Sequence, residues 1–431
     1  MVANTNSKIV IIGAGCFGLS TAYHLLRRGF TSVTVLDRSP VLPAPDAAST
    51  DLNKIVRSAY ADIFYSKLAR EAIAEWKDFE EWKDTYHESG VVVIGWGQET
   101  YADKAYENDV ALGARIETLA EPAAIRARFP ADVKTASFEG MSGYLNRDGG
   151  WAFAAQGIQL LLSKVNALGG TVVPSKSVVK LLQREGKTHG VECADGSSYE
   201  ADLVVIASGS WTASAFPDLD LGAKCLATGQ SVVMVQLSPE EGEKYRKCPV
   251  FLDLHSGFYI FPPNVDNLVK MAIHTGGHTY TQTPLGNPDH APISTPRTAL
   301  SHGDQGLRIP KEVIQNLRDN LRAVYPELAE KPFSQTRLCW YTDSPDEDWI
   351  ISVHPKDSGL VLATSGSGHA YKFLPNIGRL VVDLIQGKME PSLVQKFALD
   401  RQMVVHDIFR PGQTARELDV DELCTPEDLL P

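Results

Sequence analysis

The sequence lacks the long apolar segments that mark membrane and secreted proteins. No run of 18 apolar residues occurs, so we expect no helix that crosses a bilayer. Residues 1–7, before the first expected strand, are polar and contain no apolar core of a signal peptide. Residues 428–431 do not form a peroxisomal targeting tripeptide. These features together favour a cytoplasmic protein.

Cysteine pairs and an excess of positive charge are also missing. The six cysteines among 431 residues are scattered and form no C-x-x-C pair, which argues against a disulfide framework and a zinc site. Acidic residues outnumber basic residues by 53 to 41, and the net charge is −12. A chain of this charge is poorly suited to nucleic acid or an anionic membrane, and we expect neither as a partner.

The N-terminal 40 residues carry the clearest motif of the chain. An apolar segment, 8–12, leads into Gly13, Gly15 and Gly18, and a helical pattern follows. Asp37 ends the next apolar segment, at the distance that a dinucleotide-binding unit requires. In such a unit the glycines permit a tight turn and close approach of a pyrophosphate, while the acid accepts hydrogen bonds from a ribose. The motif predicts FAD or NAD.

The order of the apolar segments predicts an α/β fold. The nucleotide fold resumes at residues 202–211 and again at 360–363, so a second domain must be inserted between its pieces. We expect a glutathione-reductase-like (Rossmann) FAD-binding domain with an inserted α+β substrate domain built on a mixed sheet. The expected FAD-binding domain comprises residues 1–62, 150–215 and 340–395, and the substrate domain comprises residues 63–149, 216–339 and 396–431.

Three further parts of the chain carry local expectations. Residues 276–310 are rich in Gly, Pro, Ser, Thr and His, which is typical of a long surface loop that covers a site. Lys270 interrupts an apolar strand, and a lysine in that position is rarely buried unless it is paired or functional. Lys54 and Arg57 are three residues apart and would face the same side of a helical turn.

Several stretches resemble a known enzyme family. Residues 337–348 are similar to the covalent-flavin motif of the monomeric sarcosine oxidase family, and residues 366–372 and 53–60 are similar to two more of its segments. Within that family, the chain looks most like the fungal fructosyl amino acid and fructosyl peptide oxidases, the amadoriases. The stretches that support this closer resemblance are residues 144–151, 225–230 and 256–263.

The resemblance implies a role for individual residues. It makes Cys339 a covalent anchor for FAD, and it makes Lys270 the group that helps oxygen to accept electrons, with Lys54 as a second catalytic residue. It places Arg57, His274, Lys372 and Arg410 at the substrate. Together with the glycine motif, it predicts that the cofactor contacts Gly13, Gly15, Cys16, Phe17, Gly18, Asp37, Arg38, Ser49, Lys54, Val178, Ser208, Gly209, Cys339, Asp343, Gly366, Gly368, His369 and Lys372.

His274 departs from part of this family, because some amadoriases carry a glutamate at the matching position. We therefore favour α-glycated amino acids and short peptides over ε-fructosyl-lysine as substrates. His274 and His278 could suggest a metal site, but Gly276 and Gly277 between them do not suit a helical ligand pair, so we expect no metal.

The resulting hypothesis is an FAD-dependent oxidase that acts on the CH–NH group of donors with oxygen as acceptor. Its substrates would be fructosyl amino acids and short fructosyl peptides, and its products glucosone, the free amino acid or peptide, and hydrogen peroxide. Three alternatives remain open: a sister oxidase acting on sarcosine, pipecolate or saccharopine, an NAD-dependent dehydrogenase, and a non-catalytic FAD-binding protein. The resemblance also implies a monomer, and a peroxisomal location occurs in the family.

Overall fold

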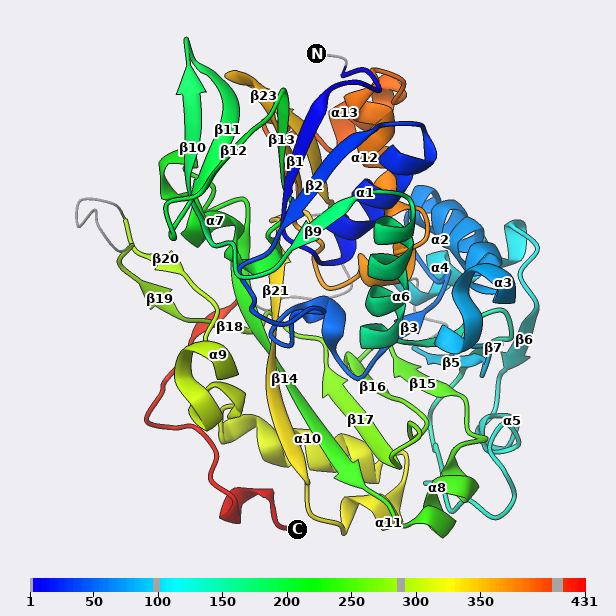
Figure 1. Ribbon diagram of the computed structural model, residues 1–431. Helices are drawn as coiled ribbons and strands as arrows, with labels where there is room; N and C mark the ends of the chain where they lie inside the picture. Colours follow the sequence, from blue (N-terminus) through cyan, green and yellow to red (C-terminus); the bar gives the residue numbers. More distant parts are fainter. Residues whose placement is uncertain (1–2, 96–100, 285–290, 405–413) are drawn as a thin grey trace.

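The computed structural model describes residues 3–95, 101–284, 291–404 and 414–431. The strands form two main sheets, one above the other in Figure 1, with helices packed around both. No helix in these four ranges is long and apolar enough to cross a membrane. The chain passes between the two sheets several times: strands of the upper sheet lie within residues 8–36, 171–206 and 350–364, and those of the lower sheet within residues 91–146, 226–343 and 416–417.

Within the described residues, the first sheet has six strands in the order β22-β23-β13-β1-β2-β9. Strand β1 pairs in parallel with both β2 and β13, and only β22 runs antiparallel to its neighbour β23. The bounds are β1 Lys8–Ile12, β2 Ser32–Leu36, β9 Thr171–Val173, β13 Leu203–Ile206, β22 Ile350–His354 and β23 Asp357–Thr364.

The first sheet is covered on both faces, which explains why β13 is apolar throughout and β1 is apolar after Lys8. A parallel sheet must bury both faces, so its strands show no alternation of polar and apolar residues. Three helices cover one face: α1 (Cys16–Arg27), α6 (Ala154–Ala167) and α12 (Ile377–Ile385). The other face packs against a three-stranded sheet of β10 (Val178–Arg184), β11 (Lys187–Cys193) and β12 (Ser198–Glu200).

The second sheet is the large mixed sheet in the lower half of Figure 1, and ten strands of the described chain form it. Its long central strand β14 pairs with β17 and β18 on one side, and with β21 on the other. The bounds are β5 Val91–Ile94, β6 Ile116–Leu119, β7 Gly143–Asn146, β14 Leu226–Gln236, β15 Val250–Asp253, β16 Phe258–Ile260, β17 Leu268–Ile273, β18 His278–Thr279, β21 Gln335–Asp343 and β24 Arg416–Glu417.

Further helices pack around the two sheets, and their sequences show why they form. In α10 (Glu312–Arg322), Ile314, Leu317 and Leu321 recur at steps of three and four and are buried. Helix α2 (Ile63–Trp76) begins at Asp62, whose side chain accepts a hydrogen bond from the Phe64 N–H at 2.8 Å. The remaining α-helices are α3 Phe79–Trp82, α4 Tyr101–Ala111, α5 Pro122–Arg126, α7 Thr212–Ala215, α8 Pro239–Tyr245, α9 Ala299–His302, α11 Pro326–Ala329 and α13 Pro391–Lys396.

The expectation of a helical turn around Lys54 and Arg57 is wrong. Residues Asn53–Val56 form strand β3, which pairs antiparallel with β8 (Gly150–Phe153); β8 also pairs with β4 (Tyr86–His87). Lys54 lies opposite Ala152 in this small sheet. Strand pairing with a distant segment overrides the local spacing here, because the ladder hydrogen bonds fix an extended backbone.

Residues 276–310 are also more regular than expected. The described part contains β18, a hairpin of β19 (Thr281–Gln282) and β20 (Ile293–Ser294), and helix α9. The hydroxyl of Ser294 donates to the carbonyl of Ala227 on β14 at 2.7 Å, which ties the segment to the second sheet. The glycine- and proline-rich composition is thus that of short elements joined by turns.

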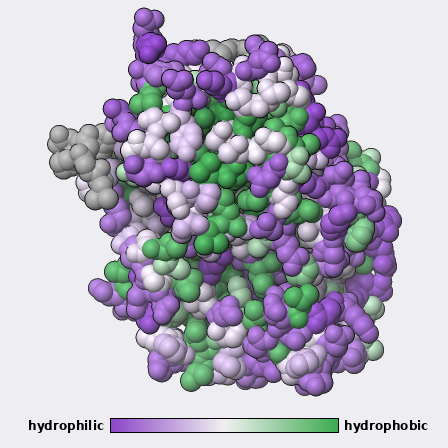
Figure 2. All heavy atoms as spheres, viewed as in Figure 1, coloured by the Kyte–Doolittle hydropathy of each residue, from purple (hydrophilic) through white to green (hydrophobic). Residues whose placement is uncertain are grey.

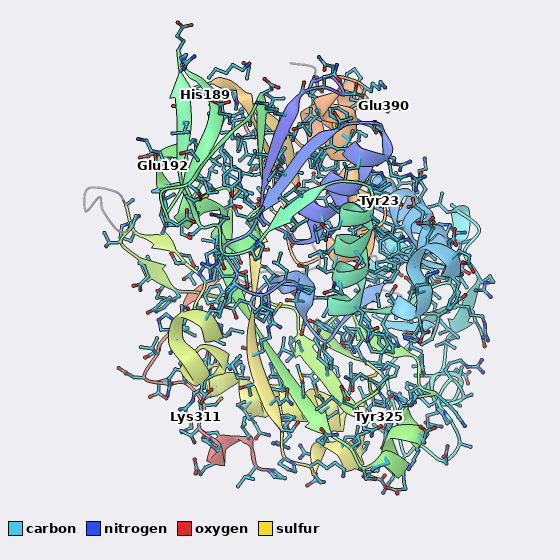
Figure 3. All side chains as sticks on the ribbon, in the orientation of Figure 1. Tyr23, His189, Glu192, Lys311, Tyr325 and Glu390 are labelled. Carbon is cyan, nitrogen blue, oxygen red and sulfur yellow. The ribbon has the colours of Figure 1, made fainter. Side chains whose placement is uncertain are left out.

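Each sheet has its own apolar core, and apolar side chains also reach the surface between them. Tyr23 belongs to the core on the first sheet and Tyr325 to the core on the second, and Figure 3 labels both. Figure 2 shows a largely hydrophilic surface on which apolar side chains gather in the middle of this face, where the surface is hollowed.

We expect the substitution Gly378→Ala to destabilise the protein, because α1 and α12 approach closely at this glycine. An added Cβ would lie 2.1 Å from the Ser20 carbonyl carbon, whose residue also binds the Gly378 N–H through its hydroxyl at 2.9 Å. Overpacking of this kind costs about 1–3 kcal/mol. Urea unfolding would measure the loss. Gly222→Ala is the control, since its Cβ meets nothing within 4 Å, and an equal loss in both variants would contradict the prediction.

Candidate functional site

The glycine turn between β1 and α1 places backbone atoms that no side chain covers at the edge of the first sheet. Gly13 has φ 109° and its N–H donates to the Leu36 carbonyl at 2.7 Å, so the turn is both left-handed and anchored. A Cβ on Gly13 would lie 2.4 Å from the Ala207 oxygen, and a Cβ on Gly18 would lie 1.8 Å from the Gly13 oxygen. Only glycine therefore permits this packing of strand, turn and helix.

Asp37, at the end of β2, fixes the same turn. Its carboxylate accepts hydrogen bonds from the Ala14 N–H at 2.7 Å and the Ser39 N–H at 2.8 Å. Burial raises the pKa of Asp37, although these two donors and the charge of Arg38 act against the rise. Each oxygen keeps a lone pair that can accept from a ribose hydroxyl, as the sequence predicts.

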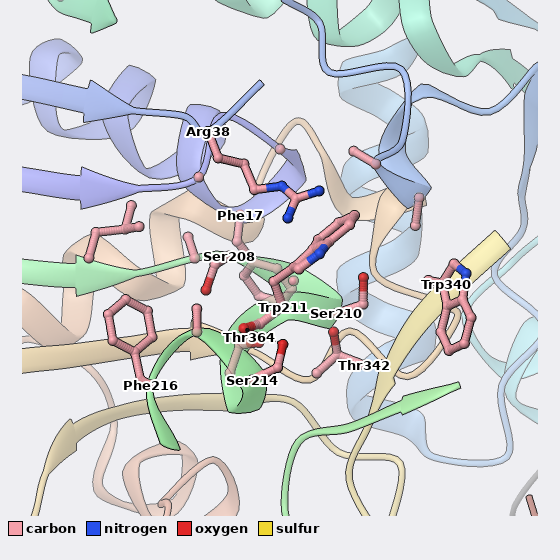
Figure 4. Close-up of a pocket in the computed structure, with 18 of the residues that line it drawn as sticks. Phe17, Arg38, Ser208, Ser210, Trp211, Ser214, Phe216, Trp340, Thr342 and Thr364 are labelled. Atoms are coloured by element: carbon pink, nitrogen blue, oxygen red, sulfur yellow. Dashed lines mark hydrogen bonds between the residues drawn. The ribbon is translucent and has the colours of Figure 1, made fainter. Parts of the chain in front are cut away.

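A cavity of about 1210 Å³ opens at the turn and runs along the edge of the first sheet. Figure 4 shows part of it, where Ser208 and Trp211 follow the end of β13 and Thr364 ends β23. The Arg38 guanidinium lies 4.1 Å from the centre of the Trp211 ring. The residues predicted to contact the cofactor that line this cavity are Gly13, Gly15, Cys16, Phe17, Asp37, Arg38, Ser49, Lys54, Val178, Ser208, Gly209, Gly366 and Gly368.

The cavity fits a dinucleotide such as FAD. Helix α1 directs the N–H groups of its first turn toward the cavity, where a pyrophosphate would be stabilised by them and by the helix dipole. At Gly15 a Cβ would approach the Ser49 hydroxyl to 3.3 Å, so a side chain there would occupy the space beside the turn. Tyr341 and Gly368 also line the cavity.

Beyond Lys54 the cavity adjoins a buried cluster of ionic side chains. Oδ2 of Asp51 accepts from Lys270 Nζ at 2.5 Å and from Lys54 Nζ at 2.9 Å, and Lys270 Nζ also donates to the Asn53 carbonyl at 2.7 Å. Lys270 is 0% exposed and Asp51 is 1% exposed. One carboxylate oxygen therefore holds two lysines.

The three charges shift one another's pKa values. Burial lowers the pKa of Lys270 to about 8, with Lys54 adding repulsion and Asp51 opposing the shift. Burial alone would raise the pKa of Asp51, but Lys270 and Lys54 outweigh it and hold that pKa well below its ordinary value. Burial alone would lower the pKa of Lys54, but Asp51 raises it. Of the two lysines, Lys270 is the one that can lose its proton near neutral pH.

Cys339 lies on β21 beside this cluster. Its sulfur is 3.6 Å from Lys54 Nζ, and the residue is 1% exposed. The next residues of the strand, Trp340, Tyr341 and Thr342, line the cavity. The structure thus brings Cys339 next to Lys54, although the two are 285 positions apart in the chain.

A second group of basic residues surrounds Tyr60. Lys372 Nζ donates to the Tyr60 hydroxyl at 2.7 Å, and the Arg57 guanidinium lies 4.7 Å from the centre of the Tyr60 ring. Lys372 is 6% exposed, and burial followed by repulsion from Arg57 lowers its pKa well below its ordinary value. Two of the four predicted substrate ligands are therefore neighbours across one aromatic ring.

The other predicted residues take the following places. His274 lies beside the cavity, where its Cε1 would be 2.9 Å from a Cβ on Gly368. Asp343 is buried and accepts a hydrogen bond from the Thr228 hydroxyl, and His369 hydrogen-bonds to Tyr60. Arg410 falls outside the described residues.

Asp51 was not predicted from the sequence as a site residue, and no role was predicted for Tyr60. Both were within or beside the stretch 53–60 that carried the family resemblance. An acid three residues before Lys54 was the available signal, but only the tertiary fold brings Lys270 to it from another sheet.

Known proteins of one enzyme family resemble this chain over most of its length. The model of the DAO family, described as FAD dependent oxidoreductase, matches residues 8–384. L-saccharopine oxidase of Schizosaccharomyces pombe is 31% identical over 404 residues, covering 88% of this chain and 90% of that protein. Two solved structures each cover 98% of both chains at 28% identity: fructosyl peptide oxidase from E. terrenum with a TM-score of 0.86, and Amadoriase II from Aspergillus fumigatus with 0.83. The expected fold class, family and FAD-dependent oxidoreductase activity are confirmed.

We expect Asp51→Ala to destabilise the protein by about 3–5 kcal/mol, because it leaves two buried lysines without their shared carboxylate. Urea unfolding of the purified protein would measure the loss. The matched control is Glu80→Ala, which removes an exposed partner of Lys83, a contact with 54% and 90% exposed side chains that contributes little. An Asp51→Ala protein as stable as the control would mean that the lysines are already neutral.

Proposed function

The chain belongs to the DAO family of FAD-dependent oxidoreductases, and on that basis we propose that it is an amine oxidase of fructosyl amino acids and short fructosyl peptides. The observation that carries the proposal is the likeness over nearly the whole chain to fructosyl peptide oxidase, combined with basic side chains buried beside the cofactor cavity. The products would be glucosone, the free amino acid or peptide, and hydrogen peroxide.

FAD would supply the redox chemistry: when bound, it takes two electrons from the carbon–nitrogen bond and is reoxidised by oxygen, which gives hydrogen peroxide. Cys339 is our candidate for its covalent attachment. The support is its position on β21, next to residues that line the cavity, with Lys54 Nζ at 3.6 Å.

Lys270 would assist the reaction with oxygen. A buried ammonium stabilises negative charge that develops near it, and the low dielectric of its surroundings strengthens the effect. Asp51 and the Asn53 carbonyl hold Nζ in one place. Lys54, the second lysine on Asp51, would balance the charge of that carboxylate, so that the proton on Lys270 makes the cluster positive.

Arg57 and Lys372 would bind the carboxylate of the substrate. Arginine presents paired N–H donors that match a carboxylate, and Lys372 adds a further donor from the other side of Tyr60. His274, near Gly368 at the end of the cavity, would contact the part of the substrate that distinguishes one amine from another. We propose Arg410 as a further ligand on the resemblance alone.

A second candidate is saccharopine, which is also a secondary amine and carries several carboxylates. Two observations favour it. The relative with 31% identity is a saccharopine oxidase, and the site offers several buried cations where a sugar would need mainly neutral partners. His274 in place of the glutamate of some amadoriases points the same way. Both candidates require the same FAD, oxygen and carboxylate chemistry.

The test is a substrate panel on the purified, FAD-loaded protein. We expect peroxide from fructosyl-valine and fructosyl-valyl-histidine, less from ε-fructosyl-lysine, and none from sarcosine. Bleaching of the flavin absorbance without oxygen would confirm that the amine itself is the electron donor. If the protein oxidises saccharopine and neither fructosyl compound, the substrate is saccharopine, and the proposed type of reaction stands.

We expect Lys270→Met to slow the reoxidation of the flavin by oxygen about 10²-fold. In the unsubstituted protein the rate of flavin reoxidation should fall as the pH rises through about 8, because Lys270 loses its proton there. The variant should show no such pH dependence. Stopped-flow mixing of the reduced enzyme with oxygen measures the rate, and anaerobic reduction by substrate serves as the control. Equal rates of flavin reoxidation in both proteins would mean that Lys270 takes no part in the reaction with oxygen.

A further inference from the structure

A chain of hydrogen bonds leads from buried Lys372 toward the surface. Lys372 Nζ donates to the Tyr60 hydroxyl at 2.7 Å, and that hydroxyl is 3.1 Å from Nδ1 of His369. Nε2 of His369 is 3.0 Å from the backbone carbonyl oxygen of Glu347. Lys372 and Tyr60 are buried, whereas His369 is half-buried.

The order of donors and acceptors in this series of hydrogen bonds follows from the contact between His369 and the Glu347 carbonyl. A carbonyl oxygen can only accept, so Nε2 of His369 must carry the hydrogen. In the neutral imidazole Nδ1 is then the acceptor, and we assign the Tyr60 O–H as its donor. Tyr60 in turn accepts from Lys372. Each donor therefore points away from Lys372 and toward His369.

The surroundings of Lys372 favour loss of a proton. Arg57 and Lys54 face it from the β3 side and repel its charge, and Cys16 of α1 is the group that acts in the other direction. Burial together with this repulsion lowers the pKa of Lys372 well below its ordinary value. Burial raises the pKa of Tyr60 well above its ordinary value, so Tyr60 must take one proton as it gives another.

We propose that Lys372, Tyr60 and His369 form a proton path that removes the proton from the ammonium group of the bound substrate. The proposal rests on the proposed function, in which Arg57 and Lys372 bind the substrate carboxylate. The amine of an amino acid is two bonds from its carboxyl carbon, so the group that binds the carboxylate is near the amine as well.

The proton transfers balance without any redox change. An N–H bond of the ammonium breaks as an N–H bond to Lys372 Nζ forms. Lys372 passes one proton to the Tyr60 oxygen, and the former Tyr60 proton moves to Nδ1 of His369. The result is a neutral amine and a charged imidazole that donates to both Tyr60 and Glu347. The neutral amine has the lone pair that must stabilise the adjacent carbon when it loses a hydride.

Arg57 makes the path compatible with substrate binding. An arginine keeps its charge at every relevant pH, so the carboxylate has a cationic partner whether Lys372 is charged or neutral. His369 suits the terminal position, because an imidazole can take up a proton near neutral pH.

The test compares three variants of the FAD-loaded protein. Tyr60→Phe removes the hydroxyl and keeps the ring that contacts Arg57 and Lys372. His369→Asn keeps an acceptor at the Nδ1 position that cannot take a proton. Tyr65→Phe is the matched control, because Tyr65 is equally buried at 5%, its ring lies 5.0 Å from that of His369, and its hydroxyl donates to Asp348 at 2.7 Å, outside the path.

The rate of flavin reduction by fructosyl-valine without oxygen is measured between about pH 6 and about pH 10, in H₂O and in D₂O. We expect Tyr60→Phe and His369→Asn to reduce the rate about 10²-fold near neutral pH and to make it rise with pH, as free amine arrives from solution. The substrate concentration for half-maximal rate should change by only a few fold. Tyr65→Phe should keep the profile of the unsubstituted protein.

The outcomes separate the two proposals. Flavin reduction with the same pH profile in Tyr60→Phe and in the control overturns the proton path and leaves the proposed function standing. If saccharopine reduces the flavin and fructosyl-valine does not, the substrate assignment fails, and the same variants measured with saccharopine decide on the path. Failure of every amine to reduce the flavin overturns both.

Discussion

The shared carboxylate of Asp51 is the contact on which the rest of the site depends. It joins Lys270 of β17, in the second sheet, to Lys54 of β3, and through Lys54 to Cys339 on β21. Charges that are this deeply buried are stable only when they are paired, because water no longer solvates them. A single oxygen therefore links the small sheet to the large one, in addition to the apolar side chains of both sheets that pack together.

The site is basic although the chain is acidic. Lys54, Arg57, Lys270 and Lys372 gather around one end of the cavity, while the whole chain has a net charge of −12. The two facts do not conflict, because salt screens exposed charges beyond about 10 Å, whereas buried charges that lie close together interact strongly in a low dielectric and are screened little. The local surroundings, and not the net charge, set the pKa values of these lysines and the charge of any group that binds to them.

Prediction from sequence succeeded where a feature is local. Gly13, Gly18 and Asp37 form one turn within 25 residues, so their spacing alone was enough to predict the dinucleotide unit. Prediction failed at residues 53–56, where pairing with β8 makes a strand of a segment whose spacing suggested a helical turn. It also failed in 276–310, where short strands and a helix form in a composition typical of loops. The roles of the predicted site residues stay predictions.

The sequence by itself determined the cofactor class, the α/β fold and the family, because each depends on short motifs whose geometry is set by neighbouring residues. Only the tertiary structure decided which charges meet. Asp51 and Lys270 are 219 positions apart, and Tyr60 and Lys372 are 312 positions apart, so no spacing rule connects them. The energy of such contacts depends on distance and burial, and both are set only when the sheets have packed together.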